Sequence, residues 1–260
     1  MATISIAKPK VQLQAYFLCA MRVVWIAVPL AVLLPLHLVW HLLRLPSPWA
    51  MLFLRIAARA LGARVHVHGS PLRRDVFFVA NHISWHDIPI LAGITGTSFV
   101  AQDGVRDWPI IGWLAKLNRT VFISRTEKQN VTQQVAELRE AIAENWSVTL
   151  FPEGTTSDGR GLLPFKQSLF ATLAPPPKPM MIQPVLLDFG ANAPDIAWVG
   201  EETGWESAWR AFTRPGTYDV GVHFLEPFDP GALADRKVVC ALARNRLAEA
   251  LSATLGYPIT

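Results

Sequence analysis

Charged residues are scarce in this chain, and acidic ones are missing from its first 74 positions. Of the 260 residues, 17% are Asp, Glu, Lys or Arg and 51% are hydrophobic, and the mean hydropathy is +0.27. Such a composition is too apolar for an ordinary soluble enzyme and too charged for a bundle of membrane spans. The length allows one sizeable domain plus a membrane-associated segment.

Cysteine is almost absent too, and one common catalytic signature is missing. The two cysteines, Cys19 and Cys240, make no disulfide framework, which indicates a reducing compartment for the globular part. Neither has a catalytic setting readable from the sequence. There is no Gly-x-Ser-x-Gly pattern, which excludes a nucleophile elbow of the hydrolase type.

The early part of the chain is basic. Nine cations precede Asp75, and they are scattered among Leu, Val and Trp: Lys8, Lys10, Arg22, Arg44, Arg55, Arg59, Arg64, Arg73 and Arg74. A basic, apolar and acid-free segment fits contact with an anionic membrane surface. Nucleic acid is not an expected partner, because its binding sites gather their basic residues into clusters.

Residues 1–62 are predicted to be a membrane-anchoring helical segment. Val23–Leu43 is 21 residues long, enough to span a bilayer, although Pro29 and Pro35 are expected to kink it. Pro48–Leu61 follows as an amphipathic helix suited to the membrane interface. A single span and a helical pair embedded in one leaflet both remain open.

Residues 63–260 are predicted to form an α/β domain. Strands are expected at 64–68, 76–80, 120–124, 147–151, 182–189 and 219–225, and amphipathic helices at 128–145 and 233–255. Strands alternating with helices predict a mainly parallel central sheet flanked by helices, with functional residues beyond the carboxyl ends of the strands.

The first chemical motif is Asn81-His82-Ile83-Ser84-Trp85-His86-Asp87, directly after a buried strand. A carboxylate five residues after a histidine can hold one imidazole nitrogen and make the other a general base. The alternative interpretation is that Asp87 is a helix N-cap, since Pro89 follows in the first turn.

Two further motifs follow strands of their own. Phe122-Ile123-Ser124-Arg125 ends in a cation that is either a solvated strand exit or an anion clamp. Phe151-Pro152-Glu153-Gly154-Thr155 supplies a carboxylate, a flexible main chain and a hydroxyl, which suit a polar headgroup. Each motif alone is compatible with an ordinary loop.

Taken in order, the three motifs resemble the blocks of the glycerolipid acyltransferase family typified by 1-acylglycerol-3-phosphate acyltransferases. Ile182-Gln183-Pro184-Val185 and Phe165-Lys166 extend the resemblance, which covers roughly residues 64–190. It implies an O-acyltransferase of phospholipid biosynthesis that forms no acyl-enzyme. The acceptor would be a lysophospholipid such as 1-acyl-sn-glycerol-3-phosphate, with acyl-CoA or acyl-carrier protein as co-substrate.

The resemblance also implies the site residues. His82 and Asp87 would be catalytic, while Asn81, Arg125, Glu153, Gly154, Thr155 and Lys166 would bind the substrate. No metal and no bound cofactor are expected. The enzyme would work at a bacterial-type inner membrane with its catalytic domain on the cytoplasmic side.

One departure bears on the acceptor. Family members that act on lysophosphatidic acid usually have Arg after Glu-Gly-Thr, whereas this chain has Thr156, and the usual Lys before the second block is missing from Ala101-Gln102-Asp103. Losing a cation beside a phosphomonoester weakens its binding unless Arg160 or Lys166 substitutes. The alternative acceptor is therefore a different lysolipid, such as the phosphorus-free lyso-ornithine lipid.

Parts of the sequence are compatible with two other functions. The pairs His37/His41, His66/His68 and His82/His86 resemble the histidine boxes of di-iron membrane lipid hydroxylases, but only His223 lies beyond residue 86. A lipid-binding scaffold of the same fold is the non-enzymatic alternative, and the presence of both His82 and Asp87 argues against it.

Overall fold

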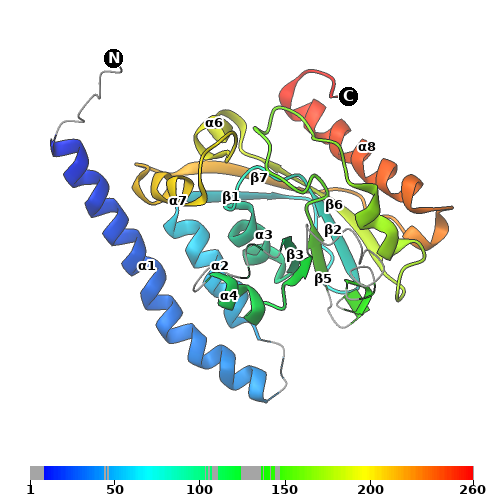
Figure 1. The fold of residues 1–260 in the computed structure, drawn as a ribbon, viewed down its shortest axis with the longest axis horizontal. Coiled ribbons are helices and arrows are strands. Elements are labelled where there is room, and N and C mark those ends of the chain that lie inside the picture. The colour runs from blue at the N-terminus through cyan, green and yellow to red at the C-terminus, as the bar shows by residue number, and fades with distance from the viewer. Residues whose placement is uncertain are drawn as a thin grey trace.

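A seven-stranded sheet forms the centre of the protein in the computed structural model (Figure 1). The structure describes residues 9–43, 45, 47–102, 104, 106, 111–123, 136, 138–140, 142, 143 and 147–259. The strands are β1 (Ala63–His68), β2 (Val76–Ala80), β3 (Ser98–Gln102), β4 (Val121–Ile123), β5 (Ser147–Leu150), β6 (Met181–Asp188) and β7 (Tyr218–Phe224). Their order is β1-β7-β6-β2-β5-β3-β4, and every neighbouring pair is parallel except β6 and β7. This confirms the predicted fold class.

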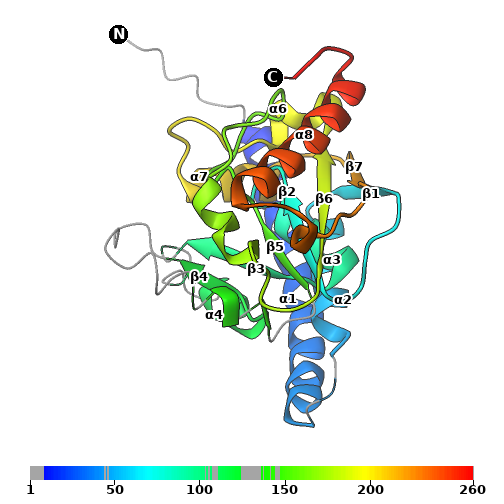
Figure 2. The ribbon, with the colours of Figure 1, turned by 90° about the vertical axis from the view of Figure 1, so that its right-hand side faces the viewer.

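Helices cover both faces of the sheet (Figure 2). The α-helices are α1 (Pro9–Leu42), α2 (Trp49–Ala60), α3 (Asp87–Thr95), α4 (Ile111–Leu117), α6 (Ala193–Ile196), α7 (Gly204–Thr213) and α8 (Arg236–Leu255). Short 3-10 helices occur at η3 (Gln167–Leu173), η4 (Gly190–Asn192) and η5 (Pro230–Ala232).

Strand β2 separates two hydrophobic cores because its side chains alternate between the faces. Phe78 and Ala80 join one core with residues of α3 and β7, whereas Phe77 and Val79 join the other with residues of η3 and α8. All five residues of β2 are buried, as expected of a central strand covered on both faces. The loop that follows β2 is therefore anchored at its start.

Helix α1 lies along one side of the domain beside α2 and α7 and is the one described helix long and apolar enough to cross a membrane (Figure 1). It continues through Pro29 and Pro35, and much of its apolar surface is exposed. Arg22 is an exception: it is buried and donates to the main-chain oxygen of Ala211 at 2.6 Å. An exposed apolar helix indicates membrane anchoring, and the predicted boundary between residues 62 and 63 stays a prediction.

Most of the other elements predicted from the sequence are present in the structure. The six predicted strands are present within one or two residues, and the predicted helices near α2 and α8 are confirmed. The helix expected to begin near Asp87 is present as α3, whereas strand β3 and helices α4, α6 and α7 were not predicted. Most of the helix predicted at 128–145 lies outside the described residues, but two of its apolar positions, Leu138 and Ile142, are described and buried.

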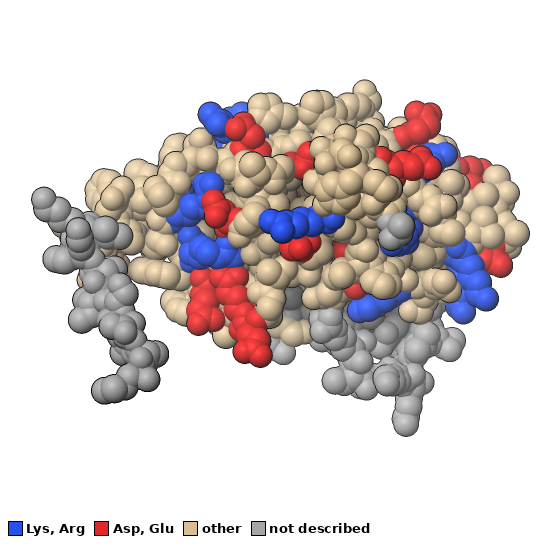
Figure 3. Space-filling model, turned by 90° about the horizontal axis from the view of Figure 1, so that it is seen from above, with Lys and Arg blue, Asp and Glu red and all other residues tan. Residues whose placement is uncertain are grey.

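Opposite charges lie side by side on the face seen from above (Figure 3). On the coloured part of that face, blue and red residues alternate over a largely uncharged surface rather than forming one basic area. This arrangement lacks the electrostatic footprint of a nucleic-acid-binding face.

Candidate active site

His82 and Asp87 meet at the carboxyl end of β2. Nδ1 of His82 lies 2.8 Å from Oδ2 of Asp87, which is fully buried, while the imidazole side chain is 19% exposed. A carboxylate at this distance accepts the Nδ1 proton and leaves Nε2 as the basic nitrogen. Nε2 makes no hydrogen bond within the part of the chain that the structure describes. The pair thus has the arrangement of a general base.

The carboxylate of Asp87 is held by the loop it closes. Its Oδ2 also accepts the main-chain N–H groups of Ile83 at 2.7 Å and Ser84 at 3.0 Å. Its Oδ1 has no hydrogen-bond partner among the described residues. The alternative that Asp87 caps a helix is wrong, because α3 starts at Asp87 itself and the N-cap position is His86.

The imidazole of His82 is fixed on its face by Phe151. Their ring centroids are 4.1 Å apart with planes inclined by 14°, and Phe151 stacks in turn on Phe99. Because β2 and β5 are parallel neighbours, the residues that follow them emerge side by side. The sequence placed Phe151 in a motif but gave no sign of this contact.

The carboxylate of Glu153 binds two main-chain N–H groups, one of which belongs to the loop of His82. Oε1 accepts the N–H of His82 at 3.0 Å and Oε2 accepts that of Leu163 at 2.9 Å. Burial raises the pKa of Glu153 to about 7, against the lowering effect of those two hydrogen bonds. In this structure Glu153 therefore holds the loop of His82, rather than presenting a carboxylate to a headgroup as predicted.

The remaining residues of the Glu-Gly-Thr turn lie close by. Gly154 has a φ of +68°, a conformation that favours glycine, and Nζ of Lys166 lies against the place where a Cβ would stand. The main-chain N–H of Lys166 also donates to Pro152 at 2.9 Å. Thr155 is exposed. The structure thus gathers Gly154, Thr155 and Lys166 at one turn, and their predicted role in binding a headgroup stays a prediction.

Two predicted binding residues do not join this group. Asn81 is buried, and its amide both donates to and accepts from the main chain of Leu187, at 2.9 and 2.8 Å. Asn81 therefore joins the ends of β2 and β6, which corrects its predicted contact with substrate. Arg125 lies outside the described residues.

His86, next to Asp87, is a buried structural group. Its Nδ1 lies 2.6 Å from the hydroxyl of Tyr218. Burial lowers the pKa of His86 to about 3, and three arginines add to the effect: Arg210, Arg214 and Arg22. His86 thus remains neutral beneath the loop.

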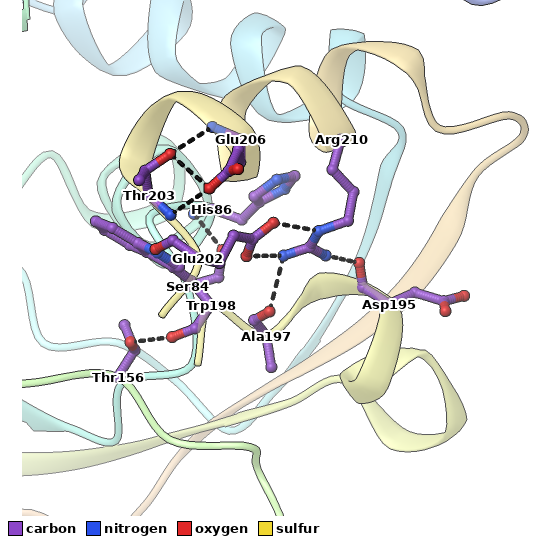
Figure 4. Close-up of polar contacts among 10 residues, drawn as sticks. All are labelled: Ser84, His86, Thr156, Asp195, Ala197, Trp198, Glu202, Thr203, Glu206 and Arg210. Atoms are coloured by element: carbon purple, nitrogen blue, oxygen red, sulfur yellow. Dashed lines mark hydrogen bonds and ion pairs between the residues drawn. The ribbon is translucent and has the colours of Figure 1, made fainter. Parts of the chain in front are cut away.

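Thr156, which stands where an arginine was expected, is turned toward the protein. Its hydroxyl donates to the main-chain oxygen of Trp198, as Figure 4 shows. Ser157 follows and donates its N–H to the main-chain oxygen of His82 at 2.7 Å. Neither contact was predicted from the sequence. The only available signal was the position of Ser157, two residues after the Glu-Gly-Thr motif.

The histidines expected in the di-iron alternative have other partners. His82 contacts Asp87, His86 contacts Tyr218, and His37 lies 2.8 Å from the hydroxyl of Ser47. In the described part of the chain, no three His, Cys, Asp or Glu side chains are grouped so as to hold a metal ion. The residues at the end of β2 therefore favour acid–base chemistry.

Comparison with known proteins supports the same conclusion. Residues 64–188 match the Acyltransferase family. The lyso-ornithine lipid O-acyltransferase of Rhizobium meliloti (strain 1021) is 36% identical over 256 residues, which cover 90% of this chain and 85% of the relative. The 1-acyl-sn-glycerol-3-phosphate acyltransferase of Neisseria meningitidis serogroup B is 31% identical over 168 residues, or 64% of this chain and 59% of the relative.

A solved structure shares the fold. The crystal structure of the 1-acyl-sn-glycerophosphate acyltransferase from Thermotoga maritima superimposes with a TM-score of 0.68 at 20% identity, covering 96% of this chain and 98% of the other. At that identity the likeness concerns the fold alone. The sequence matches show that this chain belongs to the acyltransferase family of enzymes.

Proposed function

We propose that this enzyme transfers a fatty acyl group from an acyl thioester to the free hydroxyl of a lysolipid, with His82 as general base. The observation that carries the proposal is the 2.8 Å contact between Nδ1 of His82 and Oδ2 of Asp87. It fixes one imidazole nitrogen and leaves the other to accept a proton. A ternary complex needs only such a base and two aligned substrates.

The reaction balances without an acyl-enzyme. Nε2 of His82 accepts the proton of the acceptor hydroxyl as the oxygen attacks the thioester carbonyl carbon. The carbon–sulfur bond then breaks, and the imidazolium returns the proton to the leaving thiolate. The products are an ester and the free thiol of CoA or of acyl-carrier protein. Buried Asp87 stabilises the imidazolium between these two steps.

For the acceptor we favour lyso-ornithine lipid. Four relatives of that name are 30–36% identical over 75–90% of this chain, a longer match than that of the glycerophosphate acyltransferase from Neisseria. Thr156 supports the choice, since its neutral hydroxyl is bound to Trp198 where lysophosphatidic acid enzymes usually have a cation. A phosphorus-free headgroup does not need that cation.

Lysophosphatidic acid is the second candidate. Nζ of Lys166 lies beside Gly154, within the turn that follows β5, and could stand in for the missing cation. Arg125 is expected to hold the polar end of either acceptor. If so, an Arg125→Ala variant raises the KM for the acceptor and leaves that for the thioester unchanged.

The test is acyl transfer from labelled acyl-CoA and acyl-carrier protein to a panel of lysolipids. The panel holds lyso-ornithine lipid, lysophosphatidic acid and a lysophosphatidyl diester. We expect the highest kcat/KM with lyso-ornithine lipid. A preference for lysophosphatidic acid would contradict the assigned acceptor, and transfer to none of them would contradict the function itself.

We also propose the setting of the reaction. Residues 1–62 would anchor the enzyme to the inner membrane, and residues 63–260 would work at its cytoplasmic face, with no cofactor besides the thioester. The exposed apolar surface of α1 supports the anchor. Protease digestion of sealed inverted and right-side-out membrane vesicles tests the orientation: the catalytic domain should be cut only in inverted vesicles.

A further inference from the structure

The loop that carries the catalytic histidine is hydrogen bonded at every main-chain polar group of His82 and Ile83. The N–H of His82 donates to Glu153 and that of Ile83 donates to Asp87. The oxygen of His82 accepts from Ser157 at 2.7 Å, and the oxygen of Ile83 accepts from the N–H of Trp198 at 3.0 Å. The position of the base is therefore set by four bonds: one from Asp87 of the same loop, two from Glu153 and Ser157 after β5, and one from Trp198.

The fourth bond comes from outside the family match, which ends at residue 188. Trp198 lies in residues 195–202, which we call the strap. Its main-chain oxygen accepts from the hydroxyl of Thr156, and its indole Nε1 donates to the main-chain oxygen of Glu202 at 2.7 Å. The strap thus touches both the loop of His82 and the turn after β5.

The side chain of Arg210, from α7, makes several hydrogen bonds to the strap (Figure 4). Its guanidinium binds the carboxylate of Glu202 through two bonds, at 2.8 and 2.7 Å. It also donates to the main-chain oxygens of Ala197, at 2.9 Å, and Asp195. Only arginine presents donors in a planar fork that can serve all of these acceptors together.

The neighbouring contacts keep Arg210 in place. Its helix begins with a capping box, in which Thr203 accepts from the N–H of Glu206 and the carboxylate of Glu206 accepts from Thr203. The carboxylate of Glu202 raises the pKa of Arg210 further, so the fork is charged at any working pH. Helix α7 is also bound to the apolar helix α1, because Arg22 of α1 donates to the main-chain oxygen of Ala211 in α7.

We propose that Arg210 is a positioning residue for acyl transfer, acting through the strap on the loop of His82. Without its fork, Trp198 loses its fixed place and the oxygen of Ile83 loses its partner. The imidazole then samples orientations in which Nε2 misses the acceptor hydroxyl. A misplacement of about 1 Å is enough to lower a rate on the order of 100-fold.

The experiment compares full-length Arg210→Lys and Glu202→Gln with wild type in detergent micelles. The effect expected of Arg210→Lys is a roughly tenfold lower kcat with both KM values within about twofold, because substrate contacts are unchanged. Combining it with Glu202→Gln should lower kcat little further, since both remove the same link. The control is Arg139→Lys, which alters another arginine bound to two main-chain oxygens, those of Thr172 and Pro175.

The outcomes separate the possibilities. A kcat of Arg210→Lys equal to that of wild type overturns the proposal. So does a loss of melting temperature with normal turnover per folded molecule, which is what a purely structural role gives. If Arg210→Lys does not fold, Trp198→Phe replaces it, because phenylalanine cannot make the indole bond to Glu202 but keeps an aromatic ring and the main-chain bonds of residue 198. Here kcat should fall a few-fold, while the control Trp205→Phe, at an exposed tryptophan of α7, should keep the wild-type kcat.

This inference rests on the acyl transfer proposed above, and its failure is distinct from failure of that function. A wild-type enzyme with no transfer to any lysolipid would remove the proposed function. Transfer by wild type that is unaffected in Arg210→Lys and Trp198→Phe would remove only the role of the strap.

Discussion

The imidazole of His82 lies flat on the ring of Phe151, with centroids 4.1 Å apart and planes inclined by 14°. The two residues follow neighbouring parallel strands, so the sheet itself brings them together. Asp87 holds the edge of the imidazole while Phe151 holds its face. An imidazole fixed in both ways has little freedom to rotate.

Replacing Phe151 with leucine should slow catalysis more than it weakens the fold. Leucine keeps most of the buried volume but loses an aromatic stack worth about 0.5–1.5 kcal/mol. Because the imidazole is then less well aligned with the acceptor hydroxyl, we expect a kcat lower by up to roughly tenfold. Phe99→Leu is the matched control, since it removes the stack with Phe151 but does not contact His82. Equal kcat values for the two variants would show that the stack on the imidazole is unimportant.

Asp87→Asn should isolate the charge of the carboxylate from its geometry. The amide oxygen can accept the three bonds now made by Oδ2, and the amide nitrogen can occupy the place of Oδ1, which has no partner among the described residues. We expect a melting temperature near that of wild type and a kcat lower by about 100-fold or more. Near-normal turnover would rule out the assigned pair.

The stability of the protein should depend on pH through Glu153. Its folded pKa of about 7 lies above the ordinary carboxyl value of 4.5, so the folded state binds a proton more tightly than the unfolded state. The proton's contribution to stability is complete below pH 4.5 and lost as the pH rises toward 7, a change of about 3 kcal/mol. Melting curves of wild type and Glu153→Gln should therefore diverge across that window, with the variant gaining relative stability as the pH rises.

His86 should give the stability of the protein the opposite pH dependence. Its folded pKa of about 3 lies below the ordinary value of 6.5, so the unfolded state binds the proton more tightly. The contribution of neutral His86 to stability is complete above pH 6.5. Between pH 6.5 and about 3, the free energy of unfolding falls by about 1.4 kcal/mol for each pH unit. Replacing His86 with glutamine should make the protein less sensitive to acid; the same acid sensitivity in both proteins would mean that His86 is not held neutral.

The sequence predicted the strands well because most of them are continuous apolar runs. Val76–Ala80 is buried on both faces, and such a run between turn residues has few alternatives. Strand β3, Ser98–Gln102, was missed because it contains two polar residues and pairs with β4 and β5 only in the folded sheet. Helix α7 had a readable signal, the Thr203-x-x-Glu206 capping box, which was overlooked.

The site was predicted where local spacing decides the contact. Asp87 lies five positions after His82, so their pairing could be expected from the chain alone. The contacts of Ile83 with Trp198 and of Thr156 with Trp198 join positions 115 and 42 residues apart and depend on how the sheet is assembled. The structural roles of Asn81 and Glu153 were likewise hidden, because a polar residue after a strand looks the same whether it faces substrate or main chain.

The central claim is that His82 is the base that activates the acceptor hydroxyl. The most direct test is the initial rate of transfer from a labelled acyl thioester to lyso-ornithine lipid by wild type, His82→Ala and His68→Ala. His68 is the control, a histidine on β1 stacked on His223. We predict that His82→Ala loses at least about 100-fold in kcat while remaining folded, and that His68→Ala keeps wild-type activity. A folded His82→Ala enzyme with a rate close to that of wild type would contradict the account.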